Sequence, residues 1–154
     1  MRHITDTVLQ ECFSISPLFS LMCSIRATPV PALIDSGAAP NLISEKLVHF
    51  LHLQKRKLQK PTEILPITGP SVIIQHFVRV YLYIENARFR LTLRVMNMDI
   101  PLILGRPFLI QTNPIINWRS RTITFDVNGK LIIQPLFSNG VFCKTSSQTD
   151  RCQN

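Results

Sequence analysis

The sequence predicts an all-β domain with one or two short helices. Eleven prolines and five glycines interrupt the 154 residues, which favours short strands and turns over a helical bundle. In two neighbouring stretches, 77–84 and 88–95, every second residue is apolar, as in half-buried strands that share one apolar face. Hydrophobic residues make up 45% of the chain and charged residues 17%, which excludes a compositionally disordered protein. The length fits one domain with its own core.

The strands are expected in order along the chain. Residues 18–25 and 30–34 form a hairpin around the turn 26–29. Residues 62–75 form a second hairpin with Gly69 at its tip, and 77–84 pairs with 88–95 through the turn at 85–86. Further strands are predicted at 99–104, 115–118, 121–127 and 131–135. The predicted domain occupies 17–136, between an N-terminal extension (1–16) and a loose C-terminal tail (137–154).

Two helical segments are predicted, a short helix over 44–53 and a helical turn over 107–112. Ser44 is the expected N-cap of the first. His49 and His52 share one side of that helix, but no third ligand follows at a suitable spacing, so we expect solvent exposure and no metal. No cofactor is expected.

Charge leaves a second interpretation open. The net charge is +8, and the basic run 54–60 is either a solvated loop or a nucleic-acid patch. One face of the paired strands carries four arginines, which we expect to face solvent. These are Arg79, Arg88, Arg90 and Arg94.

The cysteines and the apolar stretches predict a protein of a reducing compartment, intracellular and by expectation cytoplasmic. The four cysteines contain no Cys-x-x-Cys pair and fit no zinc module. The apolar stretch 12–25 is too short to span a bilayer, and no signal peptide is recognisable. We therefore expect no membrane partner.

The stretch with the clearest chemistry is Asp35-Ser36-Gly37-Ala38, which follows the apolar residues 32–34. A carboxylate at the end of a buried strand is unfavourable unless hydrogen bonds compensate it. Gly37 allows close backbone approach, so the segment is interpreted as a strand that delivers one carboxylate into a tight turn. Taken alone, the tripeptide is also ordinary turn chemistry.

In a second stretch, Ile100–Leu109, two apolar residues precede Gly105, and Arg106-Pro107 follow it. Gly105 lies 70 positions after Asp35. The pair resembles the retropepsin family, the aspartic proteases of retroviruses and LTR retrotransposons. The continuation Asn113–Trp118 looks like the gypsy-class retrotransposon branch and its domesticated relatives. The resemblance covers roughly residues 18 to 125.

The resemblance implies a closed β-barrel, half of an acid protease, that homodimerises and hydrolyses polypeptides. The chemistry needs two carboxylates that share one proton, one acting as base on a water and the other as acid. Because this chain has a single Asp-Ser-Gly, Asp35 would meet its counterpart on a twofold axis.

The resemblance also assigns roles to individual residues. The catalytic set would be Asp35, Ser36 and Gly37, with Ser36 hydrogen-bonding across the axis. Gly69 would be the tip of a flap that closes over the peptide. Gly105 would let its strand pack closely on the Asp35 loop. The substrate-binding residues would be Ala38, Gly69, Asp99, Ile100 and Ile103.

One departure from the family pattern concerns Arg106. Retroviral proteases have an aspartate two residues after the position of Gly37, and it pairs with the arginine matching Arg106; here that position is Ala39. Two alternatives therefore stay open beside the enzyme: an inactive domesticated domain that acts as a dimerisation or binding module, and a nucleic-acid-binding β domain.

Overall fold

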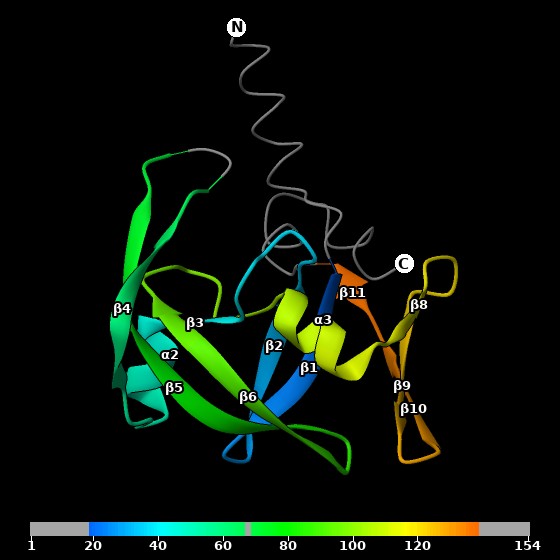
Figure 1. Cartoon of the computed structure of the whole chain (residues 1–154). Coiled ribbons are helices and arrows are strands. Elements are labelled where there is room, and N and C mark those ends of the chain that lie inside the picture. The colour runs from blue at the N-terminus through cyan, green and yellow to red at the C-terminus, as the bar shows by residue number, and fades with distance from the viewer. Residues whose placement is uncertain (1–18, 67–68, 139–154) are drawn as a thin grey trace, which may run out of the picture.

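The structure, a computed structural model, describes residues 19–66 and 69–138 and is mostly β (Figure 1). Two short helices are present in these residues, α2 (Glu45–Phe50) and α3 (Arg106–Thr112). The strands are β1 (Phe19–Ile25), β2 (Thr28–Ile34), β3 (Leu42–Ser44), β4 (Arg56–Ile64), β5 (Val72–Ile84), β6 (Ala87–Met96), β7 (Leu102–Leu104), β8 (Ile115–Asn117), β9 (Thr122–Val127), β10 (Lys130–Pro135) and β11 (Phe137–Ser138).

Six strands close into a barrel. The main sheet has the order β11-β1-β2-β7-β3-β6-β5-β4, and an additional pairing between β1 and β5 closes the ring from β1 to β5. The closing contact is short, with Ser24 opposite Tyr83 and Ile25 opposite Leu82. The predicted closed barrel is confirmed. Strands β4 and β11 extend the sheet outside the ring, and β4 with β5 forms the hairpin that rises above the barrel in Figure 1.

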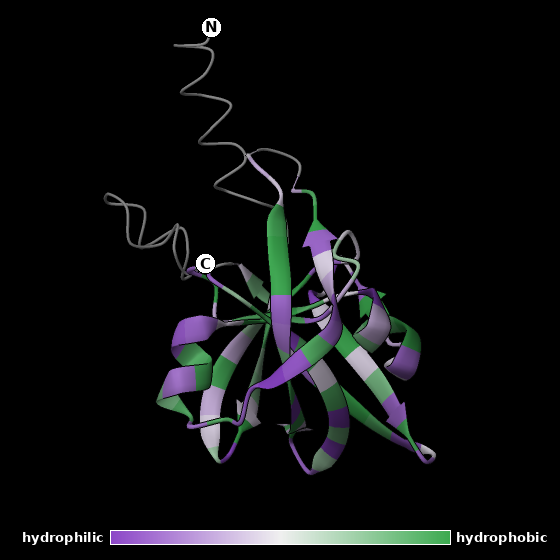
Figure 2. Cartoon of the chain, turned by 60° about the vertical axis from the view of Figure 1, so that its left-hand side comes forward, coloured by the Kyte–Doolittle hydropathy of each residue, from purple (hydrophilic) through white to green (hydrophobic). Residues whose placement is uncertain are grey.

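The interior is filled by the alternating apolar residues of the paired strands. Buried residues alternate with exposed ones along β5 and β6, and the bands of hydropathy along these strands are visible in Figure 2. Three phenylalanines then join the barrel to the elements that follow it. Phe89 of β6, Phe108 of α3 and Phe125 of β9 lie with their ring centroids 5.9 Å apart in each pair. This packing fixes α3 and the β8–β10 sheet against the barrel.

Capping interactions at both ends position α2. The Ser44 hydroxyl accepts a hydrogen bond from the N–H of Leu47 at 3.1 Å, which confirms the predicted N-cap. At the other end, Nη1 of Arg26 donates to the carbonyl of Leu51 at 3.1 Å and to that of His52 at 3.3 Å. A cation there also complements the negative end of the helix dipole.

Several sequence predictions needed correction. Most of the basic run 54–60 is not a loop, because residues 56–60 belong to β4. Arg56 and Lys57 pair with Phe77 and His76 of β5, and the pairing is irregular from there to Thr62. The hairpin with Gly69 is accordingly longer than 62–75. Phe137 and Ser138, predicted as the start of a loose tail, pair with β1 as strand β11. The extension 1–16 and the rest of the tail lie outside the described residues.

Candidate active site

Asp35 follows β2 directly and begins the loop that leads to β3. Leu33 and Ile34 pair in parallel with Ile103 and Leu104 of β7. The backbone N–H of Asp35 continues this ladder and donates to the carbonyl of Leu104 at 3.0 Å. Strand β3 pairs with the other edge of β7, so β7 lies between the two strands that flank the loop. The start and the end of the Asp35 loop are therefore both fixed by the same central strand.

The loop holds the Asp35 carboxylate with its own backbone. The N–H of Gly37 donates to Oδ1 of Asp35 at 2.8 Å, and the N–H of Ala38 donates to the carbonyl of Asp35 at 3.1 Å. Hydrogen bonds to an ionised carboxylate are stronger than those between neutral groups. The carboxylate is half-buried, while Ser36 and Gly37 are exposed at the surface. Asp35 is thus oriented and still reachable from outside.

Gly105 explains how β7 can pass so close to this loop. A Cβ at Gly105 would lie 2.3 Å from the carbonyl oxygen of Pro40 and 2.6 Å from that of Ala38. Both neighbours are backbone atoms and cannot rotate away. The next residue, Arg106, donates its backbone N–H to the carbonyl of Ala38 at 2.9 Å. The loop and the β7–α3 junction consequently pack backbone to backbone.

Asn41 is a buried amide that connects the two segments, and the sequence analysis missed it. Its Oδ1 accepts from the N–H of Gly105 at 2.9 Å and from the N–H of Phe108 at 3.3 Å. The N-cap of α3 is Gly105, which has no side chain to satisfy these donors, so Asn41 caps the helix from outside. No periodicity in the sequence distinguishes Asn41 from an ordinary turn residue after a proline.

Arg106 contacts the Asp35 loop without the aspartate that retroviral proteases supply. Its Nη1 donates to the carbonyl of Ser36 at 3.3 Å. The guanidinium is therefore bonded to a backbone oxygen of the loop, and Ala39 provides no carboxylate for it.

An open cleft of about 780 Å³ lies between the Asp35 loop, the end of β4, and β6. Its walls are largely apolar, with Thr62, Glu63 and Arg94 among the polar contributions. The lining residues include Asp35, Gly37, Ala38, Asn41, Leu42, Ile64, Leu65, Pro66, Met96, Met98, Ile103 and Pro107. A largely apolar cleft with the Asp35 carboxylate at its edge is suited to an extended peptide.

Residues 31–130 match the family model described as the PEG10/RTL1 protease domain, which covers more than half of the chain. The chain belongs to this family. Among curated proteins, none matches it significantly.

Two solved structures share the fold of this protease domain. The retroviral protease-like domain of Ddi1 from Leishmania major matches with a TM-score of 0.56 and 15% identity, over 80% of this chain and 96% of that one. The EIAV protease, solved in complex with the inhibitor HBY-793, matches with a TM-score of 0.51 and 21% identity, over 65% of this chain and 92% of that one. The retropepsin-like resemblance of the sequence is confirmed, and with it an aspartic protease-type domain.

Within this protease domain, the predicted site residues do not all line the cleft of a single chain. Asp35, Gly37, Ala38 and Ile103 do, and exposed Ser36 adjoins them. The loop between β6 and β7 contains Asp99, which is exposed, and Ile100, which is half-buried. Neither lines the cleft; from this part of the chain Met96 and Met98 do.

Gly69 lies in the connection between β4 and β5, exposed and with φ +96. This is a conformation that glycine adopts without strain. It is not among the residues that line the cleft, whereas Thr62–Pro66 of the same hairpin are. The side chains that the hairpin contributes to the cleft of one chain thus come from its first strand and the residues just after it.

Arg94 is the second residue that the sequence analysis misplaced. It was expected to face solvent with the other arginines of its strand, but it is half-buried and lines the cleft. Its Nη1 donates to Oγ1 of Thr62 on β4 at 2.5 Å. The alternation of β6 correctly predicts that Arg94 lies on the outer face of the strand. It does not predict that the β4–β5 hairpin covers part of that face.

Other catalytic chemistry finds little support in the described part of the chain. There, no three His, Cys, Asp or Glu side chains gather in a group that could hold a metal ion. Burial raises the pKa of the Cys23 thiol to about 12, and its Sγ donates to the carbonyl of Val30 at 3.2 Å. A buried thiol of this kind is a poor nucleophile.

No helix in the described residues has the length and apolar character needed to cross a membrane.

Proposed function

We propose that two copies of this chain assemble into an aspartic endopeptidase with Asp35 of each copy at a shared site. The observation that carries the proposal is the half-exposed Asp35 carboxylate, which is oriented by the Gly37 N–H at 2.8 Å at the edge of an apolar cleft. One such carboxylate cannot perform both proton transfers. A twofold axis beside the exposed Ser36 and Gly37 would supply the second.

In the dimer the two carboxylates would share one proton, because like charges at this distance cannot both ionise. The ionised carboxylate would take a proton from a water as the water attacks the peptide carbonyl. The protonated carboxyl would donate its proton to the carbonyl oxygen. The backbone bonds within the Asp35 loop would hold both groups in place, so that little reorganisation accompanies the reaction.

The composition of the cleft suggests which peptides would bind. Most of the lining is apolar, which favours apolar side chains next to the scissile bond. Among the described residues of the lining, Arg94 alone carries a positive charge. Its hydrogen bond to Thr62 uses one of the five N–H donors of the guanidinium group. The remaining donors would favour an acidic substrate side chain beside Arg94, while Glu63 is the acidic group of the lining besides Asp35.

The test is cleavage of a peptide library by the parent chain and by Asp35→Asn, with the oligomeric state measured by analytical ultracentrifugation at the same concentration. Asp126→Asn is a matched control: Asp126 lies in the β9–β10 hairpin, where its Oδ1 accepts from the N–H of Gly129, and asparagine retains that acceptor. We expect the parent and Asp126→Asn to cleave with an acidic optimum and sensitivity to pepstatin-like inhibitors. Asp35→Asn should be folded, dimeric and inactive.

Cleavage by Asp35→Asn at the parent rate would show that Asp35 is not the catalytic acid. A parent chain that dimerises but cleaves no peptide between pH 3 and 8 would instead favour the inactive dimerisation module. Ala39 stands where retroviral proteases have an aspartate, so the ion pair with Arg106 is absent, and that second function is worth testing.

A further inference from the structure

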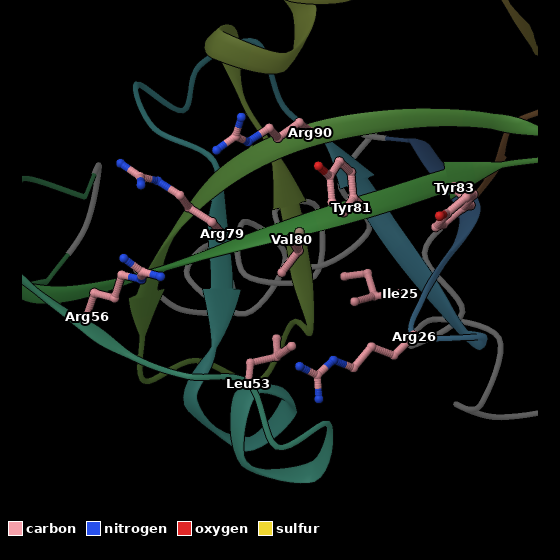
Figure 3. A pocket seen from close by; sticks show the side chains of 9 residues that line it. All are labelled: Ile25, Arg26, Leu53, Arg56, Arg79, Val80, Tyr81, Tyr83 and Arg90. Atoms are coloured by element: carbon pink, nitrogen blue, oxygen red, sulfur yellow. The ribbon is translucent and has the colours of Figure 1, made fainter.

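A second cavity opens on the outside of the barrel, at a gap in its hydrogen bonding. β5 pairs with β4 up to Phe77 and with β1 from Leu82 onward. Between these points, residues 78–81 have no strand partner on that edge within the described part of the chain. The gap holds a cavity of about 440 Å³. Its lining, drawn in Figure 3, consists of Ile25, Arg26, Leu53, Arg56, Arg79, Val80, Tyr81, Tyr83 and Arg90.

The charge of this cavity is entirely of one sign. Four of the nine lining residues are arginines and none is acidic. The strand register places two of these arginines next to Arg79. Arg56 is opposite Phe77, two residues before Arg79, and Arg90 is opposite Tyr81, two residues after it. Figure 3 shows the three side chains at the same end of the cavity. Such an arrangement attracts anions with several charges.

Two tyrosines extend the row of arginines along β5. Tyr81 is 47% exposed and Tyr83 is 37% exposed, and both lie on the same face of the strand as Arg79. The guanidinium of Arg88 lies over the ring of Tyr81, 4.5 Å from its centroid. Exposed aromatic rings between guanidinium groups provide flat surfaces beside positive charge.

We propose that this arginine–tyrosine cavity binds single-stranded nucleic acid. Guanidinium groups bind phosphate oxygens in bidentate geometry, and exposed aromatic rings stack on unpaired bases. An acidic peptide would use the arginines but would leave the tyrosines without a function. The cavity shares no lining residue with the Asp35 cleft, so the two sites use different side chains.

The experiment is fluorescence anisotropy of the full chain with labelled rU20, dT20 and a 20-base-pair duplex over a series of salt concentrations. We expect both single strands to bind more tightly than the duplex, with an affinity that falls steeply as salt rises. The double variant Arg79→Gln/Arg90→Gln should bind about tenfold more weakly or worse, and the slope of log K against log salt should decrease by about 1.4, since each lost phosphate contact removes about 0.7. Tyr81→Leu should lose about fivefold or more at an unchanged slope.

Two controls separate this site from general basicity and from misfolding. Arg119→Gln removes an exposed arginine in the connection between β8 and β9, away from the cavity, and should bind within about twofold of the parent. Arg79→Lys/Arg90→Lys keeps the charge and loses the bidentate geometry, so its affinity should lie between the parent and the glutamine variant. Asp35→Asn should bind like the parent, whatever its effect on cleavage.

The proposal is overturned if the cavity variants bind as Arg119→Gln does, because the binding is then general attraction to a basic surface. It is also overturned if poly-glutamate competes as well as rU20 and Tyr81→Leu has no effect, because the site then recognises acidic peptides. Circular dichroism of each variant establishes that a loss of binding is not a loss of fold.

Discussion

Replacement of Gly105 by alanine tests whether the Asp35 loop depends on close backbone contact. The new Cβ would lie 2.3 Å from the Pro40 oxygen and 2.6 Å from the Ala38 oxygen, closer than real Cβ contacts. The β7–α3 junction and the loop must separate to relieve this. Overpacking of this kind costs about 1–3 kcal/mol. The separation also weakens the hydrogen bond from Arg106 N–H to Ala38, which contributes about 1 kcal/mol.

The expected loss in the free energy of unfolding is therefore about 2–4 kcal/mol, or roughly 1–2 M in the urea midpoint for a domain of this size. Urea unfolding followed by circular dichroism measures it. Gly129→Ala is the matched control: Gly129 has φ +85 and nothing within 4 Å of the position that a Cβ would take, so it loses only about 1–2 kcal/mol of backbone preference. If Gly105→Ala unfolds at the midpoint of Gly129→Ala or above it, the loop does not need this contact.

Three further predictions concern single side chains. Asn41→Leu should lower the free energy of unfolding by about 2–4 kcal/mol in urea, because the buried N–H groups of Gly105 and Phe108 lose their acceptor; a parent-like midpoint would contradict the external cap. Arg94→Gln should abolish the expected preference for a glutamate over a glutamine peptide in kcat/KM, and an unchanged ratio would remove Arg94 from substrate selection. Cys23 binds its proton more tightly in the folded state, where its pKa is raised from 9.0 to about 12, so its contribution to stability is full below pH 9 and is lost between pH 9 and 12, by up to about 1.4 kcal/mol per pH unit. The melting temperature should therefore fall less steeply with pH across that range for Cys23→Ala than for the parent. Parallel curves of melting temperature against pH would show that folding does not raise the pKa of the Cys23 thiol.

Much of the barrel was predictable because its signals are local. The alternation in 77–84 and 88–95 and the Ser44 cap each depend on neighbouring residues only, and all appear in the structure. The error at 54–60 has a physical reason as well. A run of basic residues resembles a loop, but in a strand that extends beyond the barrel both faces can remain hydrated, and β4 is largely exposed.

The sequence by itself determined five of the six barrel strands, the glycine bend that presents Asp35, and the family resemblance, because each is encoded in a short run of residues. The sixth strand, β3 (Leu42–Ser44), was not predicted, because three residues are too short to show an alternation. Only the tertiary structure decided which distant residues meet. Asn41 accepts from the N–H of Gly105, 64 positions later, and so caps α3. Arg94 lines the cleft and donates to Thr62 of β4. Three arginines from two strand pairings, Arg56, Arg79 and Arg90, line one cavity. These contacts depend on the order of strands around the closed barrel and on the path of the β4–β5 hairpin. No local pattern specifies them, because residues far apart in sequence become neighbours only when the barrel closes.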